Sequence, residues 1–222
     1  MPAEETEETP DSVFWTAISV ELGLGVLALL LGWLTNVDVR QWIPRPERAE
    51  LPNIFGGIGL GMLAAIPMLL LVAVLERIDW APLRELKSLE ELPVVSALLN
   101  LSRLELVAIS IAAGIGEELL VRGWLMGWII GPVADPNVWR IGAAVLVSSV
   151  VFGLMHPISV AYTVVAALMG LFFAGILVWS GNLLVPIAAH ATYDAIHLVL
   201  SKRQMEGEKP HAKAPSDADA EE

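Results

Sequence analysis

GIGEELLVRGW, residues 114–124, places three charged side chains in the middle of a hydrophobic run that extends from about residue 98 to 130. Residues four apart share one face of a helix, so Glu118 is expected to pair with Arg122, in the favourable order of acid before base. Glu117 is turned about 100° away and has no cation near it in the sequence. The stretch therefore predicts a helix with one structural acid and one free acid; a charge cluster at a membrane edge is the alternative.

The composition around this stretch is that of a membrane protein. Of the 222 residues, 55% are hydrophobic and the mean hydropathy is +0.65, a value that soluble domains rarely reach. The absence of cysteine excludes disulfides, thiolate metal ligands and a cysteine nucleophile. A net charge of -12 argues against nucleic acid or anionic lipid headgroups as the main partner.

Hydrophobic segments long enough to cross a bilayer, which takes about 20 residues, recur along the chain. They are residues 13–35, 54–75, 98–130, 138–155, 161–179 and 183–200. We expect an all-α fold, a polytopic transmembrane bundle of about six to seven spans. Residues 77–97 alternate charged and apolar side chains, which is typical of an interfacial amphipathic helix. The run 98–130 is too long for one straight crossing, so we expect a bend after Arg122.

Two later spans also carry ionisable side chains, each in a pair of residues at helical spacing. Phe152 and His156 lie four residues apart in VFGLMHP, and His190 and Asp194 do so in HATYD. A carboxylate inside a membrane must be paired or protonated. The alternatives are a histidine at a helix end near the headgroups for His156, and a structural polar clasp for His190 with Asp194.

Two other polar residues lie within predicted spans. Glu21 is the lone acid of the first span, and we interpret it as a group that hydrogen-bonds between helices. His197 falls on nearly the same face as His190, two turns along, and we interpret it as an interfacial or packing residue.

Charged side chains in a bilayer cost about 2.5 kcal/mol or more, so the three polar helix faces are expected to meet in one cavity. Such a cavity holds a carboxylate, two histidines and a further carboxylate, which can activate water and hold an oxyanion. The same groups can form the proton relay of a transporter, which is the alternative function. The small number of spans and the lack of an inverted repeat argue against that alternative.

EELLVR at 117–122, FGLMH at 152–156 and HATYD at 190–194 resemble the CPBP (CAAX protease and bacteriocin-processing, or Abi) family of intramembrane proteases. The family pattern is EExxxR, then FxxxH, then HxxxN or HxxxD. The resemblance implies a catalytic core at residues 98–200. Residues 13–97, before this core, are expected to form two transmembrane helices and an interfacial helix. The two ends of the chain, residues 1–12 and 201–222, are expected to be disordered, the first as an acidic tail and the second as a polar tail.

The resemblance also implies a role for each motif residue. Glu117 would be the general base, sharing its water with His156, while His190 and Asp194 would hold the oxyanion. Glu118 and Arg122 would lock the helix, and the residue that packs the site would be Phe152.

Asp194 departs from the eukaryotic prenyl-protein endopeptidases, which carry asparagine there. Ionised aspartate cannot donate a hydrogen bond, so Asp194 is either protonated or orients His190 as a carboxylate–histidine pair. Resemblance to those endopeptidases implies catalysis without a cofactor. Glu117, His156 and His190 offer a zinc site as the alternative, although the HExxH helix is absent.

The expected function is that of an intramembrane endopeptidase in a prokaryotic cell membrane. Its partners would be the lipid bilayer and a peptide or protein substrate within the membrane, for example a prenylated CAAX-type tail, a bacteriocin leader or a membrane-anchored regulator. A non-catalytic immunity or scaffold protein with the same fold is a further alternative.

Overall fold

The computed structural model describes residues 10–75, 77–78, 92–132 and 136–208. Every regular element within these ranges is helical, which confirms the expected all-α bundle. In chain order the elements are α1 (Pro10–Thr35), α2 (Leu51–Leu75), α4 (Pro93–Leu99), α5 (Arg103–Glu118), the π-helical segment η2 (Leu119–Met126), α6 (Gly127–Ile130), α7 (Val138–Leu154), α8 (Val160–Ser180) and α9 (Leu184–Glu208).

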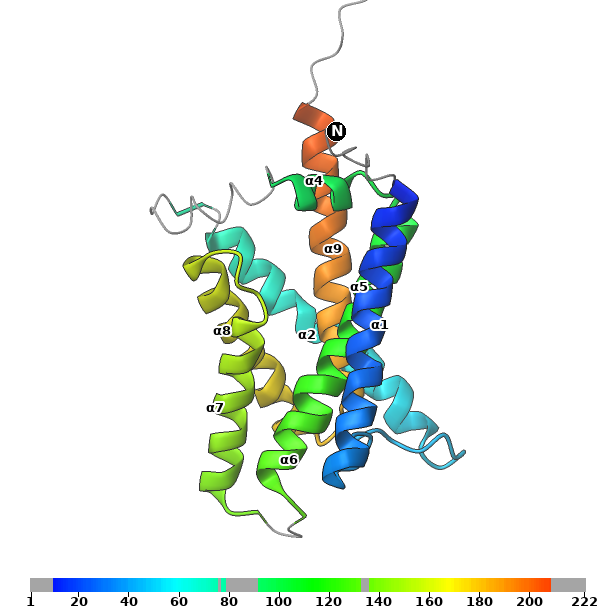
Figure 1. Ribbon diagram of the computed structural model, residues 1–222, viewed down its shortest axis with the longest axis vertical. Helices are drawn as coiled ribbons and strands as arrows, with labels where there is room; N and C mark the ends of the chain where they lie inside the picture. Colours follow the sequence, from blue (N-terminus) through cyan, green and yellow to red (C-terminus); the bar gives the residue numbers. More distant parts are fainter. Residues whose placement is uncertain (1–9, 76, 79–91, 133–135, 209–222) are drawn as a thin grey trace, which may run out of the picture.

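Four of these helices, α1, α2, α8 and α9, are long and apolar enough to cross a membrane. The apolar helix α7 is shorter, with 17 residues. The rod formed by α5, η2 and α6 carries the charged motif of residues 117–122. The rod and α7 lie alongside the long helices, and successive members of the bundle run in opposite directions (Figure 1). The protein is therefore an integral membrane protein that crosses the bilayer several times.

The rod differs from the bend that the sequence predicts after Arg122. Its helix continues through η2, where the hydrogen bonds widen to the π pattern, and reaches Ile130. A π segment accommodates extra residues without breaking the helix, and such segments are frequent at functional sites. The rod ends at Gly131, whose φ of +69° lies in the left-handed region, directly before Pro132.

Polar caps fix where the core helices begin. Ser102 and Glu105 form a reciprocal capping box at the start of α5, so Glu105 has a local structural role. Asn137 caps α7 and Ser159 caps α8 through their side-chain oxygens. These caps satisfy backbone N–H groups in the first turns of α5, α7 and α8.

The helix α9 packs against both α2 and α5. Glycines make this contact close: a Cβ on Gly61 would meet the Ala188 side chain at 2.7 Å, and one on Gly114 would meet the Ile187 carbonyl at 2.8 Å. Small residues allow membrane helices to approach backbone to backbone. This packing places His190 of α9 beside the charged motif of α5.

The helices extend beyond the boundaries expected at both ends of the chain. The start of α1 is Pro10, inside the expected acidic tail, and α9 continues past Leu200 to Glu208. Lys202 supports this last part of α9, because its Nζ donates to the Leu99 carbonyl (2.9 Å) and pairs with Glu206 (3.3 Å). Most of the expected interfacial helix, residues 79–91, lies outside the described residues, and α4 covers part of the remainder.

Candidate active site

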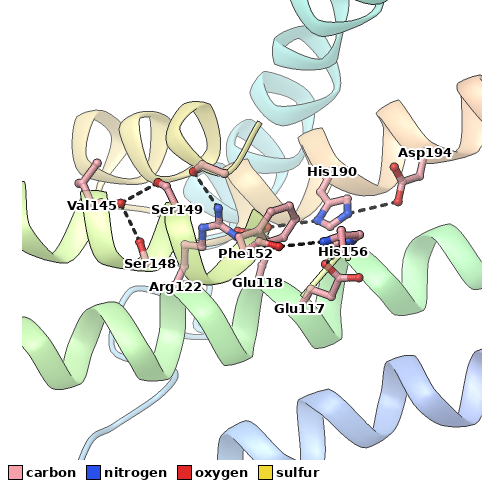
Figure 2. Close-up of polar contacts among 11 residues, drawn as sticks. Glu117, Glu118, Arg122, Val145, Ser148, Ser149, Phe152, His156, His190 and Asp194 are labelled. Carbon is pink, nitrogen blue, oxygen red and sulfur yellow. Dashed lines mark hydrogen bonds and ion pairs between the residues drawn. The ribbon is translucent and has the colours of Figure 1, made fainter. Parts of the chain in front are cut away.

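The two adjacent acids of α5 point to different partners, as helix geometry predicts. Glu118 faces the bundle interior, where its Oε1 accepts from Nη1 of Arg122 at 2.9 Å. Both side chains are completely buried. Glu117 is turned toward His156 at the end of α7 (Figure 2). One acid is thus neutralised within its own helix, and the other is available to a second group.

Arg122 is held from several sides. Its Nη2 donates to the Gly170 carbonyl of α8 at 2.7 Å, and its guanidinium carbon lies 4.5 Å from the centre of the Phe152 ring. A buried guanidinium needs this combination of a carboxylate, a carbonyl and aromatic faces, because an uncompensated charge in a dry interior is very costly. Arg122 therefore ties α5, α7 and α8 together directly behind the site.

His190 lies between two carboxylates. Its Nδ1 is 3.1 Å from Oε1 of Glu118, and its Nε2 is 3.2 Å from Oδ2 of Asp194, one turn further along α9 (Figure 2). The imidazole also stacks on Phe173 of α8, with a centroid distance of 4.9 Å. Both ring nitrogens thus face acceptors, which orients the ring and favours two N–H donors. Glu118, expected only to lock its helix, also contacts a motif histidine.

His156 is oriented by its own helix. Its Nδ1 lies 2.8 Å from the Phe152 carbonyl, which can only accept, so this nitrogen carries a proton. In the neutral ring, Nε2 then has its lone pair free, and it lies 3.8 Å from Oε2 of Glu117. That distance is too long for a direct hydrogen bond, and Oε2 of Glu117 is itself buried with no donor among the described residues.

The burial of the side chains differs across the site. The Glu117 side chain is 9% exposed, whereas those of His156 and Asp194 are 24% and 27% exposed. Phe152 lies between the two histidines, with ring centroids 5.0 Å from His156 and 5.7 Å from His190. The geometry offers a base in an apolar wall and a partly exposed rim formed by His156 and Asp194.

Two α8 residues that sequence reasoning missed complete the back of the site. Gly170 supplies a backbone carbonyl to Arg122, and Phe173 supplies the surface on which His190 stacks. Neither residue carries a charge or a motif, so a search for ionisable groups in apolar segments could not find them. His197, interpreted as a packing residue, stacks on Tyr193 at a centroid distance of 5.7 Å.

The three residues considered as zinc ligands do not meet as a ligand set. Both nitrogens of His190 face carboxylates, so among the three residues only Glu117 and Nε2 of His156 face each other. Across the described ranges no cluster of three or more His, Asp or Glu side chains is arranged to hold a metal ion. A catalytic zinc site usually has three protein ligands, so these residues do not fit one in this arrangement.

Comparison with known proteins identifies the core. Residues 99–196 match the family model described as type II CAAX prenyl endopeptidase Rce1-like. No curated protein and no solved structure matches the chain. The matched segment contains all three motifs and agrees with the resemblance noted from the sequence, which supports a CAAX-type intramembrane protease at the level of the family. Residues 99–196 are therefore similar to the Rce1-like family of type II CAAX prenyl endopeptidases.

Proposed function

We propose that this protein is an intramembrane endopeptidase that hydrolyses a peptide bond of a membrane-associated substrate with a water molecule activated by Glu117 and His156. One observation carries the proposal: the buried Glu117 carboxylate faces the free Nε2 of His156 across 3.8 Å. A carboxylate and an imidazole at this separation can hold one water between them. General base catalysis by such a positioned group contributes about 10²- to 10⁴-fold to a rate.

The reaction then follows from the positions of the side chains. Glu117 takes a proton from the water while the water oxygen bonds to the carbonyl carbon of the substrate. The tetrahedral intermediate collapses, the C–N bond breaks, and Glu117 returns the proton to the departing amine. His156 holds the water through Nε2, because its Nδ1 is committed to the Phe152 carbonyl.

His190 supplies the positive charge opposite the developing oxyanion. The carboxylates of Glu118 and Asp194 face its two nitrogens at 3.1 and 3.2 Å and support a doubly protonated ring. In this assignment Asp194 orients His190, which is the second of the two roles that the sequence leaves open for it. Preorganised charge of this kind is often the largest contribution to catalysis.

Catalysis without a metal ion is part of the proposal. Support comes from the donor set, since His190 has no nitrogen left for a metal. Dialysis against a strong chelator is expected to leave activity unchanged. Loss of activity that zinc restores would contradict this part of the proposal while leaving the assignment as a protease intact.

The substrate class follows from the family and the position of the site. We propose a protein or peptide held at the membrane, with a prenylated CAAX-type tail as the substrate that the family match favours. Because Asp194 replaces the asparagine of the eukaryotic endopeptidases, we propose a prokaryotic cell membrane as the location. In such a membrane a bacteriocin leader or an anchored regulator is the expected natural substrate, and a prenylated CAAX-type tail is the alternative to test.

Quantitative proteomics of new protein termini in membrane fractions tests the function and identifies the substrate in the same experiment. Cells that express the parent protein are compared with cells that express Glu117→Ala at equal levels. The proposal predicts termini that appear only with the parent. Identical termini in both samples, with both proteins folded, would refute it.

A further inference from the structure

Glu21 lies outside the three motifs and outside the matched segment, yet its side chain reaches the site. It is the acid in the middle of α1, a helix that otherwise offers apolar and small side chains. Its Oε2 is fully buried and finds no N–H or hydroxyl donor among the described residues. A carboxyl group in this position needs a partner, because a charge inside a bilayer is expensive.

The backbone of α1 is seated directly beside Glu117. The Gly116 Cα would lie 3.5 Å from a Cβ on Gly25, and a Cβ on Gly116 would collide with the Glu21 carbonyl oxygen. Only glycine at position 116 permits this approach. The contact fixes the register of α1 on α5, so that Glu21 and Glu117 extend into the same space from neighbouring helices.

The partner of Glu21 is Glu117. Each of the two carboxyl groups has a buried Oε2 that finds no N–H or hydroxyl donor among the described residues, and Glu21 lies within electrostatic range of Glu117, His190 and Asp194. Two carboxyl groups can form a hydrogen bond only when one of them carries a proton. If Glu117 is the ionised base of the proposed reaction, a hydrogen bond between the two groups requires the proton to be on Glu21.

We propose that Glu21 is a positioning residue of the active site: its protonated carboxyl donates a hydrogen bond to the Glu117 carboxylate and holds it toward the water shared with His156. The inference rests on the proposed function of Glu117. It adds to the site a residue from α1, which the family segment does not include, and it explains why an acid is present in an otherwise apolar span.

The test compares two uncharged side chains of similar length. Glu21→Gln keeps an N–H donor that can reach Glu117, whereas Glu21→Met removes every donor. With any substrate found in the proteomic comparison, kcat of Glu21→Gln is expected to stay within about threefold of the parent. Glu21→Met should lose about tenfold to 100-fold in kcat with KM unchanged, as for the loss of one hydrogen bond to a charged group.

Gly25→Ala is the matched control, one turn away on the same face of α1. Its new methyl group would make only ordinary contacts, 3.5 Å from the Gly116 Cα and 3.9 Å from Leu119, so activity should be unchanged. Thermal unfolding in detergent accompanies each variant. If Glu21→Met does not fold, Glu21→Asp replaces it, because the shorter side chain withdraws the donor and should also lower kcat.

The outcomes separate this inference from the proposed function. Full activity of Glu21→Met, or of Glu21→Asp in its place, would overturn the role of Glu21, as would equal losses in the Gln and Met variants. Either result leaves the protease assignment in place when Glu117→Ala is inactive. Activity in Glu117→Ala would instead remove the proposed function itself.

Discussion

The buried ion pair of Glu118 and Arg122 makes a prediction about stability that can be worked from the structure. Arg122→Met fills much of the same volume but removes the bonds to Glu118 at 2.9 Å and to the Gly170 carbonyl at 2.7 Å. It leaves a completely buried carboxylate with His190, 3.1 Å away, as its remaining charged partner. Removal of one partner of a buried pair costs about 3–5 kcal/mol, so the free energy of unfolding should fall by about that amount.

A double-mutant cycle separates the interaction energy between Glu118 and Arg122 from the contribution of their other contacts. Glu118→Gln keeps an acceptor for Arg122 and should cost about 1–3 kcal/mol, mainly through the weaker bond to the guanidinium. The double variant contains neither charge, so its loss should be smaller than the sum of the single losses by about 1 kcal/mol or more.

Reversible unfolding in mixed detergent micelles, followed by tryptophan fluorescence, provides the measurement. Arg103→Met is the control, because Arg103 begins the same helix but its ion pair with Glu206 at 3.5 Å is half-exposed. Its effect on stability should be small, as for other surface pairs. Single effects that add within about 0.5 kcal/mol, or an Arg122→Met variant as stable as the control, would refute the view that this pair locks the site.

Three further predictions concern the site. His156→Ala should lower kcat by about 10²-fold or more with little change in the unfolding temperature, since the side chain lies at the partly exposed rim; unchanged kcat would exclude it from holding the water. Asp194→Asn should lower kcat by about tenfold to 100-fold, because the asparagine amide can still orient His190 but carries no negative charge. Activity equal to that of the parent would show that the negative charge of Asp194 does not contribute to catalysis. Gly116→Ala should destabilise the protein by about 1–3 kcal/mol, because the methyl group meets the α1 backbone at Glu21; unfolding that matches the Gly25→Ala control would show that α1 is not seated there.

The sequence was sufficient for the motif helices because their chemistry is local. Spacing of four residues placed Glu118 against Arg122 and His190 against Asp194, and the structure contains both contacts, at 2.9 and 3.2 Å. The cost of charge in a bilayer predicted that the polar faces would converge. These inferences need only helix geometry and the properties of lipid.

Contacts between helices could not be predicted in the same way. The stacking of His190 on Phe173 depends on how α8 crosses α9, and the contact of Glu21 with Glu117 depends on the register of α1 on α5. The π segment at Leu119–Met126 has no signal in the hydrophobic pattern, so a bend was expected where the helix continues. The double contact of Glu118 with Arg122 and His190 also becomes visible only in three dimensions.

The central claim is that Glu117 is the base that activates water, and turnover by a Glu117→Gln variant tests it most directly. The parent and the variant are purified, reconstituted into the same liposomes, and supplied with a substrate identified from the parent's membrane fraction. If Glu117 is the base, kcat of the variant should fall by about 10²- to 10⁴-fold while the unfolding temperature stays close to that of the parent. A Glu117→Gln variant that cleaves the substrate as fast as the parent would contradict it.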